Sequence, residues 1–538
     1  MIKVVQKNED LFAADGELSQ EKFIYVLRNL HNIILFGSDN RKTYIIETNN
    51  LSRISLVKAL TSIFHRKMFL SFNAKETCKW ILQHFDIAPI DWNCCYINAQ
   101  ILKKGVNVSE KPEFVWNIER TLNYSECEDE VLKLVEISER QNKKLSDESM
   151  WRIATIEAGA IPAFAQMELY GAPVDVNRLG ELHRELFAKV QWEADSVQAE
   201  LPGEPINLES PKELLEKLKE MKIKIKKPDG KSYAIPDTSK DSLGQMVGHT
   251  ELRDGIIAYR TAMDTFEKVN SIRKFVKNKK VHATFNQIGA GTGRTSTQDP
   301  NLAGIPESLR FLFAAPKGQK IITGDYSQCE LKIIAHISQD KTMLKAFKDN
   351  VDIHSATASA VFGRSDDDLR KKAKAINFGL AYGQGEDGLA VKLACSIEEA
   401  RDIMKTHEAK FPSVYTCLRK YGDQAVKTKM AKSLLGRIRL LDDKTSEGAL
   451  RRAGANMVIQ GTAADMIKMA LWHLVKNGYQ QKMPFYTWNT VYDEISVLSF
   501  DKHRDVSSIM LASMNHAMSE IIPSVPPGVD ISINDNWD

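Results

Sequence analysis

Four side chains recur at steps of four in the segment RKKAKAINFGLAYG, which spans residues 370–383. They are two cations followed by two aromatic rings: Arg370, Lys374, Phe378 and Tyr382. Each step advances about 400° around a helix axis, so the four lie on one slowly drifting stripe. Such a stripe suits a ligand with a polyanionic end and a flat end, as a nucleoside triphosphate has. A surface helix with solvated lysines and inward-packed rings would carry the same residues, so the stripe alone leaves both interpretations open.

Two other segments place acidic residues at strand ends. The run IITGDYSQCE at residues 321–330 predicts a short strand that delivers Asp325 at its end. The run FYTWNTVYDEISVLSF at residues 485–500 predicts two strands that meet around Asp493 and Glu494. An aspartate at a strand end is more often a turn former, so Asp325 gains weight only from its place in GDYSQCEL.

In order and approximate spacing, the three segments resemble motifs A, B and C of the family A DNA polymerases, the group of bacterial DNA polymerase I and many phage replicases. The resemblance covers residues 150–538 well and residues 1–145 faintly. It implies an α+β multidomain fold, a right-hand polymerase with palm, fingers and thumb behind an N-terminal α/β exonuclease-like domain. The expected boundaries are 1–145 for the exonuclease-like domain, 146–290 for the thumb, 291–340 and 451–538 for the two parts of the palm, and 341–450 for the fingers. We expect no 5′-nuclease domain before residue 1.

The resemblance implies template-directed addition of deoxynucleotides from dNTPs to a primer 3′-hydroxyl, with release of pyrophosphate, in DNA replication or repair. Two Mg²⁺ ions, for which Mn²⁺ can substitute, would serve the attacking and the leaving oxygens. Asp325 and Asp493 are the expected metal-bridging pair, with the backbone of Tyr326 and the side chain of Glu494 beside them. Arg370 and Lys374 would neutralise the triphosphate.

The resemblance also assigns residues to the incoming nucleotide. Glu330 matches the steric gate, which lies against the sugar and leaves no room for a 2′-hydroxyl. The single-subunit RNA polymerases share the cation–aromatic stripe but lack this glutamate, so deoxynucleotides are favoured over ribonucleotides. Gln328, His354, Phe378 and Tyr382 are expected to contact the same nucleotide, although a lone histidine such as His354 is usually structural. Phenylalanine at position 378 implies discrimination against dideoxynucleotides.

Several residues are expected to contact DNA. The loop GAGTGRTST at residues 289–297 lacks the Gly-Lys-Ser/Thr of a phosphate-binding Walker loop and resembles instead the Thr-Gly-Arg-x-Ser element of the family. Its Arg294 would lie in the minor groove near the primer end, where every base pair offers an acceptor; the alternative is a turn residue held by local hydrogen bonds. Arg310 would contact the template backbone. A polar stripe on one helix face would read the minor groove, or else is an ordinary solvated face: Arg452, Asn456 and Gln460.

Two further features bear on DNA binding. Tyr492 stands where the family has histidine before the Asp-Glu of motif C, and its ring and hydroxyl could still position the primer end. The basic segment at residues 222–231 predicts a strand-and-turn tip. The resemblance implies that this is the tip of the thumb and that Lys224, Lys226 and Lys227 lie on the duplex backbone. A run of lysines is usually a solvated surface, which is the alternative for this tip.

Residues 1–145 predict an α/β unit, with strands at 32–37 and 43–47 and a helix at 55–64. An exonuclease site of this family needs about four carboxylates around two metals. Asp15 and Glu17 offer the first Asp-x-Glu element, but Thr77 stands at the expected second aspartate, next to Glu76. The third element matches only loosely, with Tyr124 followed by Glu128. We therefore expect an exonuclease fold with weak or no proofreading.

Composition sets outer limits. The 538 residues are too many for one core and should divide into several domains. Hydrophobic content of 43%, charged content of 27% and a net charge of +3 are ordinary for a globular protein, so any nucleic-acid surface must be local. No apolar run approaches about 18 residues, and the seven cysteines lack paired metal spacing. We expect a cytoplasmic monomer with free thiols, whose partners are primer–template DNA and dNTPs, with no membrane and with room for accessory replication proteins. A phage replicase and a trimmed bacterial enzyme both fit.

Overall fold

A computed structural model of the chain describes residues 2–537 except 19, 22, 29–31, 38–41, 65–67, 72, 88–90, 105–123, 227–230 and 382. The chain divides into two compact units. Unit 1 comprises residues 1–172, 282–304 and 315–538, and unit 2 comprises residues 173–281 and 305–314. Within the described ranges, no helix is both long and apolar enough to cross a membrane.

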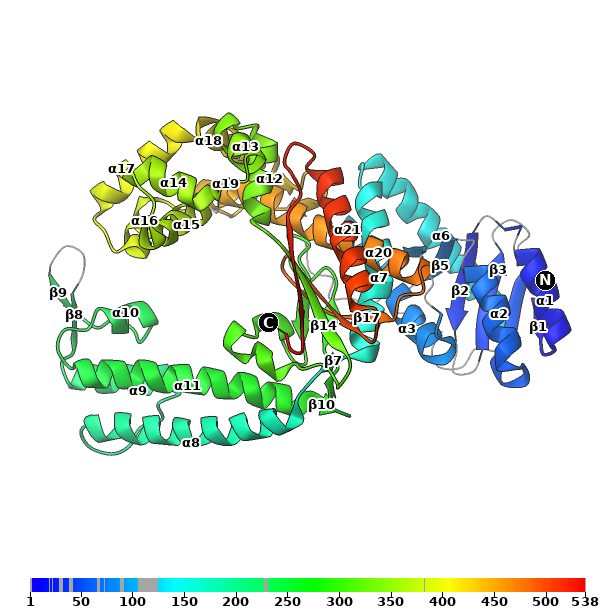
Figure 1. Cartoon of the computed structure of the whole chain (residues 1–538), viewed down its shortest axis with the longest axis horizontal. Helices are drawn as coiled ribbons and strands as arrows, with labels where there is room; N and C mark the ends of the chain where they lie inside the picture. Colours follow the sequence, from blue (N-terminus) through cyan, green and yellow to red (C-terminus); the bar gives the residue numbers. More distant parts are fainter. Residues whose placement is uncertain are drawn as a thin grey trace. The chain divides into compact units, whose positions relative to one another are not determined.

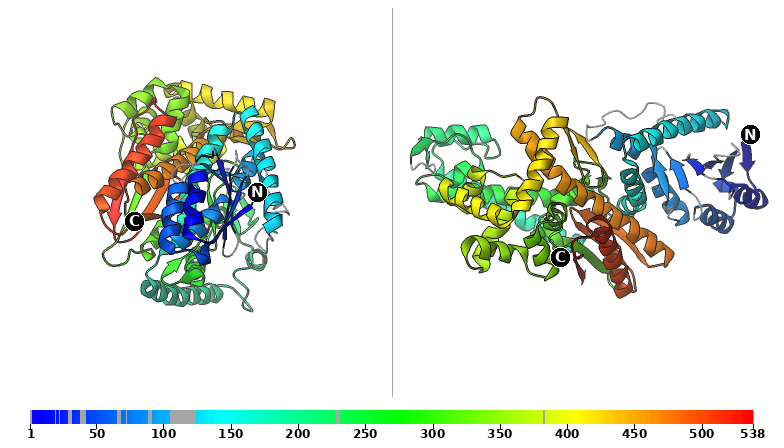
Figure 2. Two further views of the ribbon diagram at one scale, coloured as in Figure 1. Left: turned by 90° about the vertical axis from the view of Figure 1, so that its right-hand side faces the viewer. Right: turned by 90° about the horizontal axis from the view of Figure 1, so that it is seen from above.

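Unit 1 begins with a six-stranded mixed sheet in the order β1-β4-β3-β2-β5-β6 (Figure 1). Its strands are β1 (Ile2–Val5), β2 (Phe23–Arg28), β3 (Asn32–Gly37), β4 (Thr43–Glu47), β5 (Met68–Ser71) and β6 (Trp92–Cys94). Its helices are α1 (Asn8–Leu18), α2 (Arg53–Phe64), α3 (Ala74–Phe85), α4 (Cys95–Leu102) and α6 (Tyr124–Asp147), and the sheet and helices are the blue and cyan elements of Figure 2. The α/β unit expected here is confirmed, including the two strands and the helix predicted from hydrophobic pattern.

The N-terminal sheet shares a core with the helix that follows it, α7 (Trp151–Tyr170). Apolar residues of α3 and α7 belong to one buried cluster. Glu168 of α7 accepts hydrogen bonds from Lys75 at 2.5 Å and Lys79 at 2.9 Å, both on α3, and from the backbone of Phe285 at 2.9 Å. Because these pairs are largely shielded from water, they fix the N-terminal sheet to the rest of unit 1.

A four-stranded antiparallel sheet in the order β17-β18-β14-β19 forms the centre of unit 1. Its strands are β14 (Lys320–Tyr326), β17 (Phe485–Val491), β18 (Glu494–Ser499) and β19 (Val529–Asn534). Its neighbours are α12 (Cys329–Ser338), α20 (Thr462–Gln480) and α21 (His503–Ile521), and α7 packs on β17 (Figure 1). Two short antiparallel strand pairs precede strands of this sheet in the sequence. Before β14 come β12 (Thr284–Asn286) and β13 (Ser296–Gln298), and before β17 come β15 (Met430–Lys432) and β16 (Ile438–Leu440). The predicted strand around Asp325 and the predicted strand pair around Asp493 are confirmed.

The helices at residues 341–428 form a region with its own small apolar core around Ile376 and Leu389. They are α13 (Lys341–Lys348), α14 (Ile353–Phe362), α15 (Asp367–Ala381), α16 (Glu386–Leu393), α17 (Ile397–Lys410) and α18 (Pro412–Thr428). The side chain of Asp366 accepts a hydrogen bond from the backbone of Leu369 at 2.9 Å, which caps the start of α15. The stripe predicted to run from Arg370 to Tyr382 on one helix holds as far as Ala381, and Tyr382 lies outside the described residues.

The polar stripe Arg452–Asn456–Gln460 does not lie on one continuous α-helix, which corrects the step-of-four prediction. Helix α19 (Glu447–Asn456) passes into a π-helical turn, η4 (Met457–Gly461), before α20 begins. A π-turn carries an extra residue and rotates the helix face, so Gln460 does not continue the α-helical register of Arg452 and Asn456. Such turns are not readable from hydrophobic spacing, and they are frequent at functional sites.

Unit 2 is built on two long helices, α8 (Val176–Glu200) and α11 (Thr250–Phe275), which lie side by side (Figure 1). Their shared core also takes in α9 (Pro211–Glu220) and α10 (Lys240–Gly244). The predicted basic strand and turn are present as the hairpin of β8 (Lys224–Lys226) and β9 (Ser232–Ala234). The unit also holds β10 (Val276–Lys277), β11 (Lys280–Val281) and the short helix η3 (Glu307–Leu312). Its first segment starts at Pro173, whereas the predicted thumb starts at residue 146; the five domain boundaries stay predictions.

Candidate active site

Strand pairing brings acidic residues together at one end of the central sheet. Asp325 on β14 lies directly opposite Glu494 on β18 and Asp530 on β19. Paired residues of antiparallel strands carry their side chains on the same face. Asp493 itself lies in the turn between β17 and β18, and its carbonyl accepts a hydrogen bond from the backbone of Tyr326 at 3.3 Å. The expected pairing of Asp325 with Asp493 on adjacent strands is therefore correct in position, with Asp493 one residue outside its strand.

Electrostatics at this end of the sheet are those of a carboxylate cluster. Burial raises the pKa of Asp493 to about 6, and the charges of Glu330 and Glu494 add to the rise while Arg294 opposes it. Carboxylates of this cluster also act on Cys329, whose pKa is raised by burial and further by Asp493, Glu330 and Asp325. The carboxylates around Asp493 that raise its pKa give the site surplus negative charge, which a divalent cation would relieve.

Glu494 is held in place by neutral donors. Its Oε1 atom accepts hydrogen bonds from the indole Nε1 of Trp537 at 2.6 Å and from the hydroxyl of Ser496 at 3.3 Å. The atoms at this site that could bind a metal ion are carboxylate oxygens, the ligand type that Mg²⁺ takes. The residues present fit a divalent, oxygen-liganded ion, with Asp325, Asp493 and the backbone of Tyr326 as the expected holders.

Arg294 spans the edge of this cluster. Its Nη2 atom lies 2.7 Å from Oε1 of Glu330, which is 8% exposed. Its guanidinium lies 5.5 Å from the ring centre of Tyr492. Tyr492 is 62% exposed and has a left-handed backbone conformation with φ of 55°. One arginine therefore contacts both the predicted sugar gate and the predicted primer-end tyrosine.

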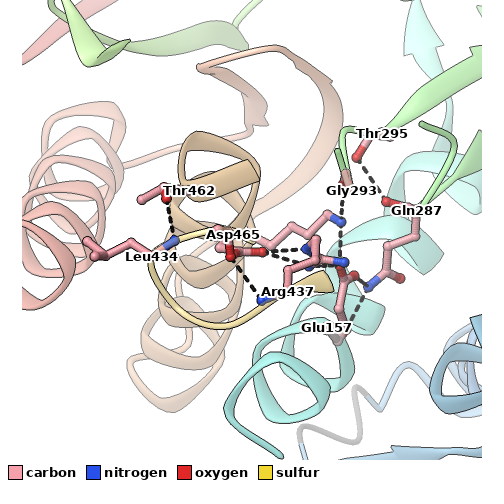
Figure 3. A network of polar contacts seen from close by, with 10 residues as sticks. Glu157, Gln287, Gly293, Thr295, Leu434, Arg437, Thr462 and Asp465 are labelled. Carbon is pink, nitrogen blue, oxygen red and sulfur yellow. Dashed lines mark hydrogen bonds and ion pairs between the residues drawn. The ribbon is translucent and has the colours of Figure 1, made fainter. Parts of the chain in front are cut away.

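A buried charge network lies behind Arg294 (Figure 3). Its four charged members are 5% exposed or less: Glu157 of α7, Arg437 next to β16, and Asp465 and Lys468 of α20. Lys468 lies 2.5 Å from Oε1 of Glu157, which also contacts Arg437, and Nε of Arg437 donates to Asp465 at 2.7 Å. Gln287 donates to Glu157 at 2.6 Å and Ser433 donates to Asp465 at 2.8 Å. Two acids and two bases thus balance one another inside the protein.

Burial sets the direction of each pKa in this network. Burial disfavours charge on Glu157, but Lys468 and then Arg437 outweigh it and bring the pKa of Glu157 below its ordinary value. Burial raises the pKa of Asp465 in spite of Arg437. Burial lowers the pKa of Lys468 to about 8. These shifts identify a site where desolvation is strong and the ion pairs are needed to hold the charges.

The buried charge network fixes the glycine-rich loop that carries Arg294. Lys468 donates to the backbone carbonyl of Gly293 at 2.6 Å (Figure 3). Gly293 has a φ of 84°, and a Cβ atom there would lie 2.6 Å from Nε of Arg437. Only glycine fits both the conformation and the close approach. The position of Arg294 is therefore tied to a rigid, desolvated core.

The helical region carries the two predicted triphosphate cations. Arg370 makes a bidentate pair with Asp352, at 2.8 Å and 3.3 Å, and it lowers the pKa of Asp352 to about 2 against the effect of burial. Lys374 is exposed one turn further along α15. Gln328 also donates to Asp352, at 3.4 Å. Asp352 thus gathers three elements around the place where the triphosphate is expected.

His354 is buried next to a polar residue of α15. It is 4% exposed, and its Nδ1 atom lies 3.0 Å from the amide nitrogen of Asn377. Asn377 in turn accepts hydrogen bonds from Thr357 and lies 3.0 Å from His407. This is a buried polar hub that ties α14, α15 and α17 together. Contact between His354 and a triphosphate stays a prediction, and the side chain of Phe378 lies outside the described residues.

Comparison with known proteins identifies the family. The family model for DNA polymerase family A matches residues 176–538. The chain belongs to this family. Among curated relatives, DNA polymerase I of Pseudomonas aeruginosa is 33% identical over 422 residues, covering 72% of this chain and 44% of that protein. DNA polymerase I of Caldicellulosiruptor bescii is 27% identical over 549 residues, covering 96% of this chain and 61% of that protein. The chain therefore spans about half the length of these relatives.

A solved structure matches the whole chain of this family A member. The POL domain of Pol1 from M. smegmatis, in complex with DNA primer-template and dNTP, superposes with a TM-score of 0.83 at 26% sequence identity. The match covers 99% of each chain. The predicted α+β polymerase fold is thereby confirmed, and so is the assignment to family A.

The predicted DNA contacts of this family A chain are placed as follows. Arg452 is exposed, and Asn456 and Gln460 are half-buried around the π-turn. In unit 2, Lys224 and Lys226 are exposed on either side of buried Ile225, and Arg310 lies on η3. Lys227 lies outside the described residues.

The N-terminal acids whose side chains the structure describes do not form a group of three metal-ligating side chains. Glu17 on α1 is paired with Lys3 at 2.5 Å and Lys42 at 2.7 Å. Thr77 is buried on α3, where its hydroxyl lies 3.0 Å from that of Ser71. Among the residues described, the single group of three metal-ligating side chains lies elsewhere, on α20 and α21. The side chains of Tyr124 and Glu128 lie outside the described residues.

Sequence reasoning missed two parts of the site. The first is the buried charge network, whose signal is a charge inside an otherwise apolar helix, as at Glu157 and Lys468. The second is Asp530, which β-strand register places opposite Asp325. The alternation of VDISIN at 529–534 predicts a strand, but no local pattern says which strand it pairs with.

Proposed function

We propose that this chain is a DNA-directed DNA polymerase that adds deoxynucleotides from dNTPs to a primer 3′-hydroxyl and releases pyrophosphate. The observation that carries the proposal is the carboxylate cluster at the end of the central sheet, where Asp325 and Asp493 meet in a chain of family A. The complex of the M. smegmatis relative with DNA primer-template and dNTP supports the same substrates here. Replication and repair are both compatible with this activity.

Mg²⁺ ions bound at Asp325 and Asp493 would supply charge stabilisation for the attacking and leaving oxygens. The chain's own residues bind and orient the substrates. Lys374 is exposed and free to neutralise a triphosphate, whereas Arg370 must exchange Asp352 for a phosphate, another bidentate acceptor. Glu330 would close the space under the sugar, and Arg294 would pass from Glu330 to the minor groove of the primer end.

The remaining predicted contacts complete the proposal. Tyr492, Arg452, Asn456 and Gln460 would follow the minor groove, and the lysine tip of unit 2 would grip the backbone without regard to sequence. We expect a cytoplasmic monomer that needs no membrane. The five predicted domain boundaries belong to the same proposal.

Primer extension tests this function directly. The full chain, a 5′-labelled primer on a longer template, Mg²⁺ and either the four dNTPs or the four NTPs are mixed, and product length is read on a gel. The proposal expects extension to the template end with dNTPs and little with NTPs. Absence of extension with any nucleotide would contradict a polymerase, and extension with NTPs alone would contradict the assignment of Glu330.

For the N-terminal sheet we propose a structural role with weak or no proofreading. Glu17 is engaged with two lysines, Thr77 cannot supply a negative charge, and Glu168 fastens α3 to α7. A 5′-labelled primer with a 3′ mismatch, incubated with Mg²⁺ and no dNTP, tests this role. Shortening at a rate comparable to extension, lost on Asp15→Ala, would contradict it.

A further inference from the structure

Three potential metal ligands converge on the outer side of the helix pair α20 and α21. His473 comes from α20, and His516 and Glu520 come from successive turns of α21. One ligand atom from each lies within 4.8 Å of the other two. Nε2 of His516 lies 3.5 Å from Oε2 of Glu520, close to the spacing between two ligands of one ion.

Neighbouring side chains orient these three groups. Nη2 of Arg152 lies 2.9 Å from Oε1 of Glu520, which leaves Oε2 directed at His516. The ring of His473 stacks on Trp472 with centroids 5.1 Å apart and meets the ring of His516 edge to face at 4.5 Å. Partners that hold a carboxylate or a ring in one orientation are typical of the surroundings of metal ligands.

The exposure of the cluster leaves it open to ions in solution. His473 is half-buried, and His516 and Glu520 are exposed. Arg152 lies next to Glu520 and Lys476 lies near His473, so both cations oppose the positive charge that a metal ion would add. We therefore expect moderate affinity, in the range of a regulatory or adventitious surface site and below that of a closed structural one.

We propose that His473, His516 and Glu520 form a binding site for a divalent transition-metal ion of the zinc class. Two imidazole nitrogens and one carboxylate oxygen, with water in the fourth position, are a set that Zn²⁺ takes. Mg²⁺ prefers oxygen ligands throughout, so the ions needed for polymerisation would not compete strongly. A bound ion would link α20 to α21 and stabilise the pair on which the central sheet packs.

Calorimetric titration of the untagged full chain with zinc chloride, after removal of metals by a chelator, tests the proposal. We expect one ion per chain with micromolar affinity, unchanged by excess Mg²⁺. His516→Gln and Glu520→Gln should each weaken binding by tenfold or more, because each removes one of three ligands. His503→Gln, on the same helix but hydrogen-bonded to Ser499, is the matched control and should bind as the parent does.

Two further measurements, cobalt absorption and circular dichroism, complete the test. Replacing zinc by Co²⁺ should give the visible absorption of a tetrahedral site in the parent and the control, and lose it in both ligand variants. Because His516 and Glu520 are exposed, parent-like circular dichroism is expected and assigns the lost affinity to the ligands. Failure of the parent to bind zinc, or equal binding by the parent and both ligand variants, would overturn the site, and neither result depends on polymerase activity.

Discussion

Two groups of charges lie close together in unit 1 and are treated in opposite ways. In the buried charge network, Glu157 and Asp465 face Arg437 and Lys468, so two negative charges meet two positive ones away from water. In the carboxylate cluster, Asp325, Asp493, Glu330 and Glu494 crowd at a sheet end, with Arg294 as the cation that acts on Asp493. One group is balanced by the protein itself, and the other carries an excess of negative charge.

The difference separates structure from function. Desolvated charges destabilise a fold unless they are paired, so a balanced network is what a buried support requires. The carboxylates of the cluster raise the pKa of Asp493, and repulsion among them costs folding free energy, a cost that is typical of sites built for a charged ligand. The surplus negative charge of the cluster fits our proposal that metal ions bind there.

The two regions meet at the glycine-rich loop. Lys468 of the buried charge network holds the carbonyl of Gly293, and the next residue, Arg294, contacts Glu330. The balanced region thus positions the cation that serves the unbalanced one. A change in the network should reach the site through this single peptide segment.

The largest expected effect is on activity at the carboxylate cluster. Asp493→Asn should reduce primer extension by about a thousandfold or more, equivalent to ~4 kcal/mol of transition-state stabilisation, because it removes a proposed metal ligand. The same substitution should leave the urea midpoint of unfolding unchanged or higher, since it relieves repulsion among carboxylates. DNA binding, measured by fluorescence anisotropy, should persist.

Asp505→Asn, an exposed position on α21, is the control for removing one negative charge from the same unit. It should leave extension at the parent level. Extension by Asp493→Asn at nearly the parent rate would show that Asp493 is not one of the metal-binding pair. A large loss of stability in Asp493→Asn would show that the charges of the carboxylate cluster are already balanced within the protein.

The opposite pattern is expected in the buried charge network. Lys468→Met leaves Glu157 and Asp465 with one cation between them and should cost about 3–5 kcal/mol of folding free energy, as removal of one partner of a buried ion pair does. The urea midpoint should fall clearly, as measured by tryptophan fluorescence. Extension by the folded fraction should fall less than in Asp493→Asn, because the carboxylates remain.

A matched surface pair separates burial from charge. Lys345 lies 2.5 Å from Asp349 on the exposed side of α13, and Lys345→Met should cost less than about 1 kcal/mol. The double variant Glu157→Gln with Lys468→Met removes one charge of each sign and should regain part of the loss. A double variant less stable than Lys468→Met would show that packing, and not charge balance, governs the region.

Much of the carboxylate cluster was predictable from sequence. Asp325, Asp493 and Glu494 lie in short β-rich segments whose strands follow from local pattern, and the motif order assigned their chemistry. The stripe of Arg370 and Lys374 follows from helical periodicity alone. The fold class followed from the same motifs.

The remaining features depend on contacts between distant segments. Glu157 and Lys468 are 311 positions apart, and no local pattern pairs a glutamate of one helix with a lysine of another. No local pattern pairs Asp352 with Arg370, yet the two residues are hydrogen-bonded across 18 positions. The π-turn at 457–461 inserts a residue into a helical register that the sequence shows as unbroken.

A substitution of Glu330 tests whether the carboxylate cluster also selects between deoxynucleotides and ribonucleotides. Glu330→Ala should lower the ratio of kcat/KM for dNTP over rNTP by about tenfold or more, since a steric barrier against one hydroxyl is removed. Glu398→Ala, exposed on α17, is the control and should keep the parent ratio. An unchanged ratio in Glu330→Ala would reassign Glu330 as a partner of Arg294 with no role at the sugar.

The smallest effect on stability is expected at Glu17, whose ion pairs lie near water, unlike those of Glu157. Lys3, Lys42 and Tyr44 lower the pKa of Glu17 from its ordinary value of 4.5 to about 2, but one third of its side chain is exposed (33%). Because the folded-state pKa is depressed, these pairs stabilise β1 and β4 above about pH 4.5, and the stabilisation is lost as the pH falls towards 2. Solvent screening should keep the effect well below that of Lys468→Met.

Hydrogen exchange measured by mass spectrometry can resolve an effect of this size. Glu17→Gln should speed exchange in peptides that cover β1 and β4 at pH 6, and its difference from the parent should shrink towards pH 3, where Glu17 of the parent begins to lose its advantage. Glu9→Gln, an exposed change on the same helix, should match the parent throughout. Only a charge interaction is lost as the carboxylate is protonated. A difference that stayed constant from pH 6 to pH 3 would therefore come from packing of the glutamate side chain, and it would show that the ion pairs of Glu17 contribute as little to stability as an isolated surface pair.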